Sequence, residues 1–197
     1  MNELMLGAAL LWLYTFVFAV VHSLMATNSI KTKLYARGLA AHHYRLFYSV
    51  FGIITTLLWL WAIYVLPDTP LYHIEGVLAY ILYALQVVGV LIALAAFAPI
   101  DGAIFLGFKK AEISSDPFII QGVFQYVRHP MYAGAMLFLL AKPEQSLIGF
   151  HFALAVSLYF IIGSKLEEKR MLADHPSYAD YQQQVGAFIP KLFSRSS

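Results

Sequence analysis

A basic pair followed by a proline forms the first candidate site of this chain. Arg128 and His129 directly precede Pro130 and a long apolar run. Because proline fits the first turn of a helix, Pro130 predicts a helix N-terminus, where unpaired N–H groups and the positive end of the helix dipole collect. Together with the basic pair, this helix end predicts a site for a carboxylate or a phosphate. The alternative is a basic pair that only anchors a membrane span to lipid headgroups.

Two adjacent carboxylates form the second candidate site. Glu167 and Glu168 follow the last apolar run of the chain. They could lie on a solvated helical turn, in which Glu167 pairs with Arg170 and Glu168 with Lys165 at a spacing of three residues. A turn at residues 142–145 would instead bring them beside the basic pair, and the two sites together would suit a zwitterion such as an amino acid moiety. Nearby aromatic residues offer surface for a purine ring or a cation: Phe124, Tyr126 and Tyr132.

The composition places these sites in a membrane protein. Of the 197 residues, 60% are apolar and 12% are charged, and the mean hydropathy is +0.69. A soluble domain of this size cannot hide so much apolar surface, so the surplus must face lipid. This excludes a soluble enzyme and a disordered chain, and a net charge of only +2 excludes a nucleic-acid-binding module. The chain has no cysteine and its histidines are scattered, so we expect no metal site.

The apolar runs predict an all-α polytopic membrane protein with about five transmembrane helices. Three runs are long enough to cross roughly 30 Å of hydrocarbon at about 1.5 Å per residue. Two shorter runs follow, and we expect them to form a helical hairpin. A C-terminal cytoplasmic helical segment completes a single integral-membrane domain, with residues 1–98 as a three-helix N-terminal part and residues 99–197 as its core. The predicted runs are Leu4–Ala26, Leu46–Leu66, Val77–Ala98, Met131–Ala141 and Ser146–Gly163.

The distribution of positive charge predicts the orientation. All Lys and Arg residues except Lys142 lie in segments that share one side of the membrane. By the positive-inside rule this side is cytoplasmic and the N-terminus is outside. We expect the inner membrane of a bacterium, with both candidate sites on the cytoplasmic side. Within the third run, Gln86 is expected to hydrogen-bond a neighbouring helix.

The two candidate sites carry a resemblance to a known family. The run Arg128–Gly134, the pair Glu167-Glu168 and the stretch Tyr178–Tyr181 follow one another in this chain. This ordered set resembles the signature of the integral-membrane S-adenosylmethionine-dependent methyltransferases, which include isoprenylcysteine carboxyl methyltransferase and phospholipid N-methyltransferases. The chain has no glycine-rich strand-to-helix turn, so a Rossmann site for the cofactor is excluded.

The resemblance implies that S-adenosyl-L-methionine is the cofactor, enclosed between the hairpin and the C-terminal segment in a methyltransferase core of residues 99–197. It implies catalytic roles for His129 and Arg128, with Arg128 supporting the methionine carboxylate and His129 serving as a base if one is needed. Glu167 and, less directly, Glu168 would bind the ammonium group or the ribose hydroxyls. The implied cofactor contacts are Tyr126, His129, Pro130, Met131, Tyr132, Glu167 and Glu168.

Shorter matches in the first runs resemble one branch of this family. Residues around His22, the Tyr44-Arg45 entry to the second run and the stretch 163–168 resemble the branch that holds methanethiol S-methyltransferase and NnrU-like proteins. Prenylcysteine enzymes carry an arginine one turn before the glutamate pair, whereas residues 162–164 of this chain include none. The resemblance therefore implies an acceptor without a carboxylate, either a small thiol or a lipophilic molecule from the bilayer, and substrate contacts from His22, Tyr44 and Arg45. His22 could instead hydrogen-bond a backbone carbonyl at the membrane interface.

Three other functions stay open at this point. An isoprenylcysteine-type carboxyl methyltransferase or a phospholipid N-methyltransferase would use the same cofactor on another acceptor. An NnrU-like accessory protein would keep the cofactor motifs without catalysis. A transporter is disfavoured, because no charged residue lies in the middle of a run and no internal repeat is visible.

Overall fold

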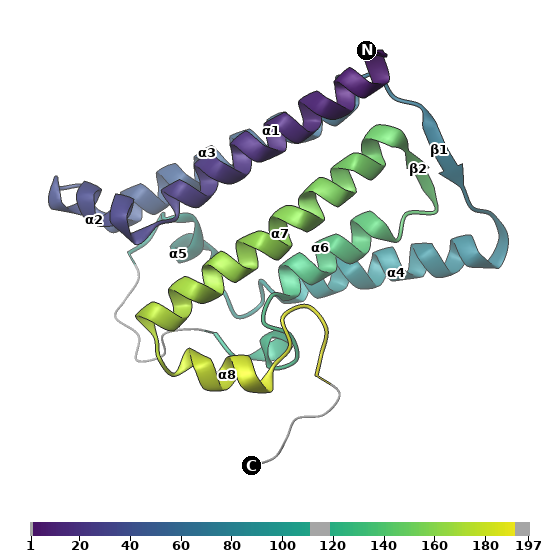
Figure 1. The fold of residues 1–197 in the computed structure, drawn as a ribbon. Coiled ribbons are helices and arrows are strands. Elements are labelled where there is room, and N and C mark those ends of the chain that lie inside the picture. Colours follow the sequence, from purple (N-terminus) through teal and green to yellow (C-terminus); the bar gives the residue numbers. More distant parts are fainter. Residues whose placement is uncertain (1, 111–118, 192–197) are drawn as a thin grey trace. The chain divides into compact units, whose positions relative to one another are not determined.

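Long apolar helices dominate the fold. The computed structural model describes residues 2–110 and 119–191. Within these residues, the helices long and apolar enough to cross a membrane are α1 (Glu3–Met25), α3 (Ala41–Val65), α4 (Gly76–Ala95) and α7 (Leu147–Asp174). A further apolar helix, α6 (Pro130–Leu140), is shorter, and Figure 1 shows these helices along the chain. The chain is therefore an all-α polytopic integral membrane protein, as the apolar runs predict.

Short elements connect the long helices. The short helices are α2 (Asn28–Ala36), α5 (Gly102–Leu106), the 3-10 helix η1 (Gly122–Gln125) and α8 (Tyr178–Gln184). Two strands, β1 (Pro70–His73) and β2 (Glu144–Ser146), pair as a two-stranded sheet. The sequence pattern did not predict α2 or the strands, because α2 is polar over much of its length and the strands are too short to leave a period.

By its contacts the chain divides into two compact units. The first comprises residues 1–71, 101–114 and 146–155, and the second comprises residues 72–100, 115–145 and 156–197. Helix α7 therefore starts in the first unit and ends in the second. The basic pair, the glutamate pair and α8 all belong to the second unit, whereas the candidates for substrate contacts belong to the first.

Aromatic packing joins the helices of the first unit. The ring of Trp59 on α3 lies 5.1 Å from the rings of both Phe18 on α1 and Phe152 on α7. The Tyr14 hydroxyl donates a hydrogen bond across to the carbonyl oxygen of Thr55 at 2.6 Å. Inside a bilayer, such packing and interhelical hydrogen bonds hold helices together, because lipid is as apolar as the side chains. Accordingly α1 and α3 lie side by side (Figure 1).

Polar contacts fix the start of α7 in the same unit. A helix begins with N–H groups that have no intrahelical partner. The Asp68 carboxylate accepts the Ile148 N–H at 2.9 Å, and the Ser146 hydroxyl accepts the Gly149 N–H at 3.1 Å. One turn further, His151 accepts a hydrogen bond at Nδ1 from the Trp12 indole at 3.1 Å. The loop that closes the second predicted run thus sets where the last long helix begins.

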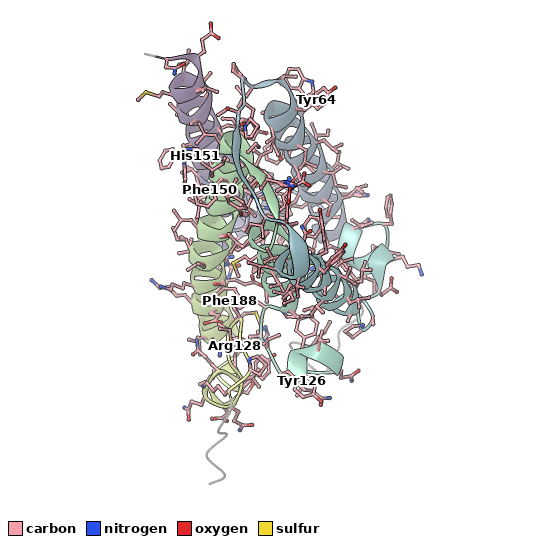
Figure 2. All side chains as sticks on the ribbon, turned by 90° about the vertical axis from the view of Figure 1, so that its right-hand side faces the viewer. Tyr64, Tyr126, Arg128, Phe150, His151 and Phe188 are labelled. Atoms are coloured by element: carbon pink, nitrogen blue, oxygen red, sulfur yellow. The ribbon has the colours of Figure 1, made fainter. Side chains whose placement is uncertain are left out.

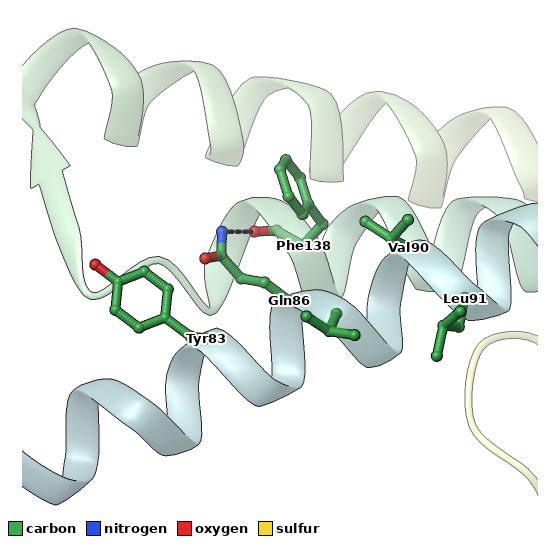
Figure 3. A pocket seen from close by; sticks show the side chains of 6 residues that line it. Tyr83, Gln86, Val90, Leu91 and Phe138 are labelled. Atoms are coloured by element: carbon green, nitrogen blue, oxygen red, sulfur yellow. Dashed lines mark hydrogen bonds between the residues drawn. The ribbon is translucent and has the colours of Figure 1, made fainter.

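Two glycines let α4 and α6 approach closely in the second unit. A Cβ atom on Gly89 would lie 2.6 Å from the carbonyl oxygen of Gly134, and a Cβ atom on Gly134 would lie 2.4 Å from that of Gly89. Small residues at a crossing let helix backbones touch, which strengthens packing in lipid. Gln86 adds a hydrogen bond from Nε2 to the carbonyl oxygen of Phe138 at 2.9 Å (Figure 3), which confirms its predicted interhelical role. Because α6 begins at Pro130, this crossing fixes the helix that follows the basic pair.

An apolar groove of about 310 Å³ opens beside this crossing. It is lined by α4 residues, among them Tyr83 and Gln86, and by Phe138 of α6 (Figure 3). A groove of about 390 Å³ in the first unit is lined by α1 and α3 residues. Both have almost entirely apolar linings, as expected of surfaces that face lipid acyl chains, and neither includes a residue of the two predicted motifs.

Candidate active site

The structure brings the two predicted motifs into direct contact in the second unit. The basic pair lies on a short extended stretch between η1 and α6, and the glutamate pair lies on the C-terminal part of α7. Figure 2 shows Arg128, Tyr126 and Phe188 toward the same end of this unit. The hairpin of α6 and α7 thus returns the chain to the place where α6 began, as the turn at residues 142–145 predicts.

Arg128 and Glu168 form a buried ion pair. The guanidinium donates from Nε and Nη2 to Oε1 of Glu168, both at 2.8 Å. The two side chains are only 8% and 10% exposed. Arg128 also donates to the carbonyl oxygens of Gln182, at 3.0 Å, and Val185, while the Gln182 amide donates to Oε2 of Glu168 at 2.7 Å. A buried charge is tolerated only when it is paired and hydrogen-bonded, and here both charges are.

His129 completes this cluster. Its Nε2 lies 2.9 Å from Oε1 of Glu168, and the residue is 8% exposed. The imidazole packs against two rings, with Tyr132 stacked at 5.5 Å and Phe188 tilted at 5.7 Å between centroids. His129 is also the N-cap residue of α6, yet its side chain makes no capping hydrogen bond. The ring is therefore oriented by Glu168 and by its aromatic neighbours rather than by the helix that it precedes.

The second glutamate of the pair has a different environment. Glu167 is half-buried, and its Oε2 accepts one long hydrogen bond of 3.3 Å from the Tyr132 hydroxyl. The Tyr132 ring stacks on Phe160 at 4.5 Å. A carboxylate offers about four acceptor positions, so Glu167 keeps capacity for a further donor. The adjacent acids thus differ: Glu168 is occupied within the chain, and Glu167 is open to a ligand.

The stretch after α8 closes around the basic pair. Val127 and Gly186 form a parallel β-bridge. The N–H group of Arg128 donates to the Gly186 carbonyl at 2.8 Å, and that of His129 donates to the Ala187 carbonyl at 2.9 Å. These bonds give the buried backbone N–H groups of Arg128 and His129 their acceptors. They also explain how Phe188 reaches the His129 ring.

Two tyrosines of α8 lie beside the cluster, Tyr178 buried and Tyr181 half-buried. The Tyr181 hydroxyl donates to the carbonyl oxygen of Phe124 at 2.6 Å, which ties α8 to η1. Burial raises the pKa of Tyr178 to about 12, with a further upward contribution from the Glu168 carboxylate that Arg128 opposes. Burial also raises the pKa of Tyr181 to about 12, with a contribution from Tyr178. Both phenols therefore stay neutral at every pH at which the protein is handled.

Alkaline titration should reveal these two phenols. An unfolded tyrosine ionises near pH 10, whereas Tyr178 and Tyr181 ionise near 12 in the folded chain. The unfolded state therefore loses protons first, so the stabilisation from both groups is full below about pH 10 and declines as the pH rises toward about 12. Ultraviolet absorbance of tyrosinate should show a late component that is smaller in a Tyr178→Phe, Tyr181→Phe variant. A late component unchanged in that variant would assign it to other tyrosines.

The remaining predicted cofactor contacts lie around the start of α6. Pro130 is buried as the first residue of the helix, and Met131 is half-buried. Tyr126 is 65% exposed and so presents its ring outward. Within the described residues, no group of histidines and carboxylates could hold a metal ion.

The predicted substrate contacts have their own surroundings in the first unit. The His22 ring lies 5.2 Å from Phe18 and 4.4 Å from Tyr48, and its Nδ1 is buried without a hydrogen-bond partner among the described residues. Nδ1 therefore makes no hydrogen bond to a backbone carbonyl among the described residues. The Tyr44 hydroxyl donates to the Met25 carbonyl at 2.5 Å, and Arg45 donates to the Ile104 carbonyl at 3.2 Å. Substrate roles for these three residues stay predictions.

Comparison with known protein families identifies the family of this chain. The family model described as NnrU protein matches residues 10–177, which include both motifs. The chain belongs to the NnrU family. It is 31% identical over 187 residues to methanethiol S-methyltransferase 2 of Bradyrhizobium diazoefficiens, a match that covers 91% of this chain and 71% of that protein. It is 29% identical over 189 residues to methanethiol S-methyltransferase of Crocosphaera subtropica, covering 91% and 73%.

A third relative is also named methanethiol S-methyltransferase. Methanethiol S-methyltransferase of Pseudomonas deceptionensis is 31% identical over 189 residues, which cover 89% of this chain and 70% of that protein. No solved structure matches the chain. The likeness to the methanethiol S-methyltransferase and NnrU-like branch of membrane methyltransferases is thus confirmed.

Three residues of this NnrU-family site were not found by sequence reasoning. Gln182 binds Glu168, Phe160 stacks on Tyr132, and Phe188 packs on His129. Phe160 lies inside an apolar run, and Gln182 lies in a stretch of three glutamines, so neither stands out by type. Their position gave the one usable signal, because Gln182 and Phe188 follow the motif Tyr178–Tyr181, which was already assigned to the site.

Proposed function

We propose that this NnrU-family protein is a membrane methyltransferase that transfers a methyl group from S-adenosyl-L-methionine to a small thiol such as methanethiol. The names of the relatives support this reaction class and acceptor. The observation that carries the proposal is the direct contact between the Arg128-His129 motif and the glutamate pair. That contact gathers the family's methyltransferase motifs into one buried polar cluster within a membrane protein.

The residues present fit the proposed cofactor. Glu167 has acceptor capacity left for the ammonium group or the ribose hydroxyls. The first N–H groups of α6 receive no cap from His129, so they can bind the methionine carboxylate. The rings of Tyr132 and the exposed Tyr126 offer surface for the adenine and for a positively charged sulfur.

Within this proposal the chain's own residues bind and orient the reactants. The cofactor would supply a methyl group on a positively charged sulfur, and the thiol sulfur would attack that methyl carbon in line. Positioning and the exclusion of water supply most of the acceleration in such a transfer. Arg128 is fully engaged with Glu168 and two carbonyl groups, so we assign it a positioning role at the methionine end. His22, Tyr44 and Arg45 remain proposed substrate contacts, and a lipophilic acceptor would reach the site through the bilayer.

We also propose the orientation. The positive-inside rule favours an N-terminus outside and a C-terminus with the active site in the cytoplasm, as in the inner membrane of a bacterium. Cytoplasmic access suits the proposed reaction, because S-adenosyl-L-methionine is a soluble, charged molecule that does not cross the hydrocarbon core unaided.

Replacing Glu167 tests the cofactor assignment. Glu167→Ala should weaken binding of S-adenosyl-L-methionine to the purified protein about tenfold or more, because a hydrogen bond to a charged group is lost. Isothermal titration calorimetry measures the affinity. The matched control is Glu75→Ala, which removes a carboxylate that is 82% exposed and should leave the affinity unchanged. Equal affinities for both variants and the wild type would contradict the role of Glu167.

Isotope transfer tests the reaction. Membranes that hold the protein should form labelled dimethyl sulfide from methanethiol and a cofactor with a deuterated methyl group, as measured by mass spectrometry. Labelled phospholipid or labelled prenylated peptide would instead indicate another acceptor of the same reaction class. Cofactor binding without any labelled product would favour an NnrU-like accessory role.

A further inference from the structure

The His129–Glu168 contact has the geometry of a proton-accepting pair. We propose that Nδ1 of His129 takes the proton of the acceptor thiol while Glu168 holds the opposite ring nitrogen. This inference rests on the proposed function and names the group that makes the thiol nucleophilic. Glu168 would then be a positioning residue for His129, not a ligand of the cofactor.

The contact with Glu168 fixes the tautomer of His129. Oε1 of Glu168 lies 2.9 Å from Nε2 of His129 and also receives two hydrogen bonds from Arg128. A carboxylate paired with a guanidinium is ionised and can only accept hydrogen bonds. Nε2 must therefore carry a hydrogen and donate it. In a neutral imidazole the other nitrogen, Nδ1, then has a lone pair that can accept a proton.

Nδ1 of His129 is left available to accept a proton. An N-cap side chain ordinarily accepts a hydrogen bond from the helix that it precedes, but His129 makes no such bond to α6. The rings of Tyr132 and Phe188 lie against the imidazole, and Glu168 contacts it at Nε2. Among the residues that the structure describes, no hydrogen bond to Nδ1 is formed. Nδ1 is thus the ring nitrogen that is left for a ligand.

The net charge of the site also favours a base that takes the thiol proton. A free alkanethiol is mostly protonated at neutral pH, and bringing its anion into a dry site costs several kcal/mol. Arg128 and Glu168 already neutralise each other, and the Glu167 carboxylate accepts a hydrogen bond from the Tyr132 hydroxyl. If the thiol enters neutral, the site holds one positive charge before the transfer, on the donor sulfur. After the transfer it again holds one, on the His129 imidazolium, which Glu168 stabilises.

The step is balanced. The bond from the donor sulfur to the methyl carbon breaks, and its electron pair stays on that sulfur. The acceptor sulfur forms the new bond to the methyl carbon and loses its hydrogen as a proton to Nδ1 of His129. The imidazolium later releases this proton to water, so the products are two neutral thioether groups and one proton.

The acidity of the thiol tests the proposal. His129→Gln keeps a side-chain donor for Glu168 but has no basic nitrogen. With an alkanethiol, its kcat should fall about 100-fold or more, the usual contribution of a general base. With an aromatic thiol that is already ionised at neutral pH, the fall should be less than about tenfold. Glu168→Gln should show the same contrast, and calorimetry should show that both variants still bind S-adenosyl-L-methionine.

A spectroscopic measurement keeps the test independent of turnover. Heteronuclear NMR of the full chain with histidine labelled at its ring nitrogens should show one residue in the Nε2–H form at neutral pH, absent from the spectrum of His129→Gln. A His129 signal in the Nδ1–H form overturns the proposal. Equal losses of kcat with both thiols also overturn it, since His129 then acts in binding. A wild type that binds no S-adenosyl-L-methionine overturns the proposed function instead.

Discussion

Replacing Glu168 by alanine is expected to lower the free energy of unfolding by about 3–5 kcal/mol, the usual cost of removing one partner from a buried ion pair. Arg128 would remain buried, since its side chain is only 8% exposed, and it would lose its carboxylate partner. The Gln182 amide and Nε2 of His129 would lose their acceptor as well. The cost arises from the uncompensated charge, not from the intrinsic strength of the pair.

Unfolding of the detergent-solubilised protein, followed by circular dichroism with increasing denaturant, measures this change. The matched control is Glu167→Ala, which removes the neighbouring carboxylate on the same helix. Among the described residues, its carboxylate accepts one long hydrogen bond, from Tyr132, so a loss of less than about 1 kcal/mol is expected. Similar losses for the two variants would contradict the different environments of the two acids.

Placing a methyl group on Gly134 is expected to lower the free energy of unfolding by about 1–3 kcal/mol, as overpacking does in a tight core. The new Cβ atom would lie 2.4 Å from the carbonyl oxygen of Gly89 and 2.7 Å from the backbone nitrogen of Ala93. Neither atom belongs to a flexible side chain, so α4 and α6 must move apart. The hydrogen bond between Gln86 and the carbonyl group of Phe138 would lengthen with them.

Gly163→Ala is the matched control for this substitution. Gly163 also lies within an apolar helix, but a Cβ atom there would meet no atom within 4 Å. Alanine favours helix over glycine by about 1 kcal/mol, so this variant should be as stable as the wild type or slightly more so. Thermal unfolding of Gly134→Ala and Gly163→Ala should differ in sign. Equal melting temperatures would contradict the close crossing.

The sequence predicted the elements better than their contacts. Apolar runs locate α1, α3 and α4 because a span of hydrocarbon demands a length that few other structures need. Pro130 marked the start of α6 because the missing N–H and fixed φ of proline suit a first helical turn. The polar helix α2 was not predicted, because its nine residues carry neither a long apolar run nor a strong hydrophobic period.

At the candidate site, residue types were predicted and the pairing was not. The motifs pointed to Arg128, His129 and both glutamates, but either acid could have paired with either base. Helical geometry decides this, because adjacent residues on α7 point in directions about 100° apart. Glu168 therefore meets the basic pair while Glu167 meets Tyr132. Likewise, Gly89 and Gly134 are ordinary glycines in apolar runs, and only the crossing of their helices gives them a role.

The carbonyl groups that accept from Arg128 and His129 have a consequence for biosynthesis. They belong to residues of α8 and the stretch beyond it, the nearest of which, Gln182, follows Arg128 by 54 positions. A ribosome finishes every long helix of the described chain before it adds these partners. The candidate site must therefore assemble after the long helices have been synthesised, and a nascent chain that stops short of residue 187 lacks the groups that complete it.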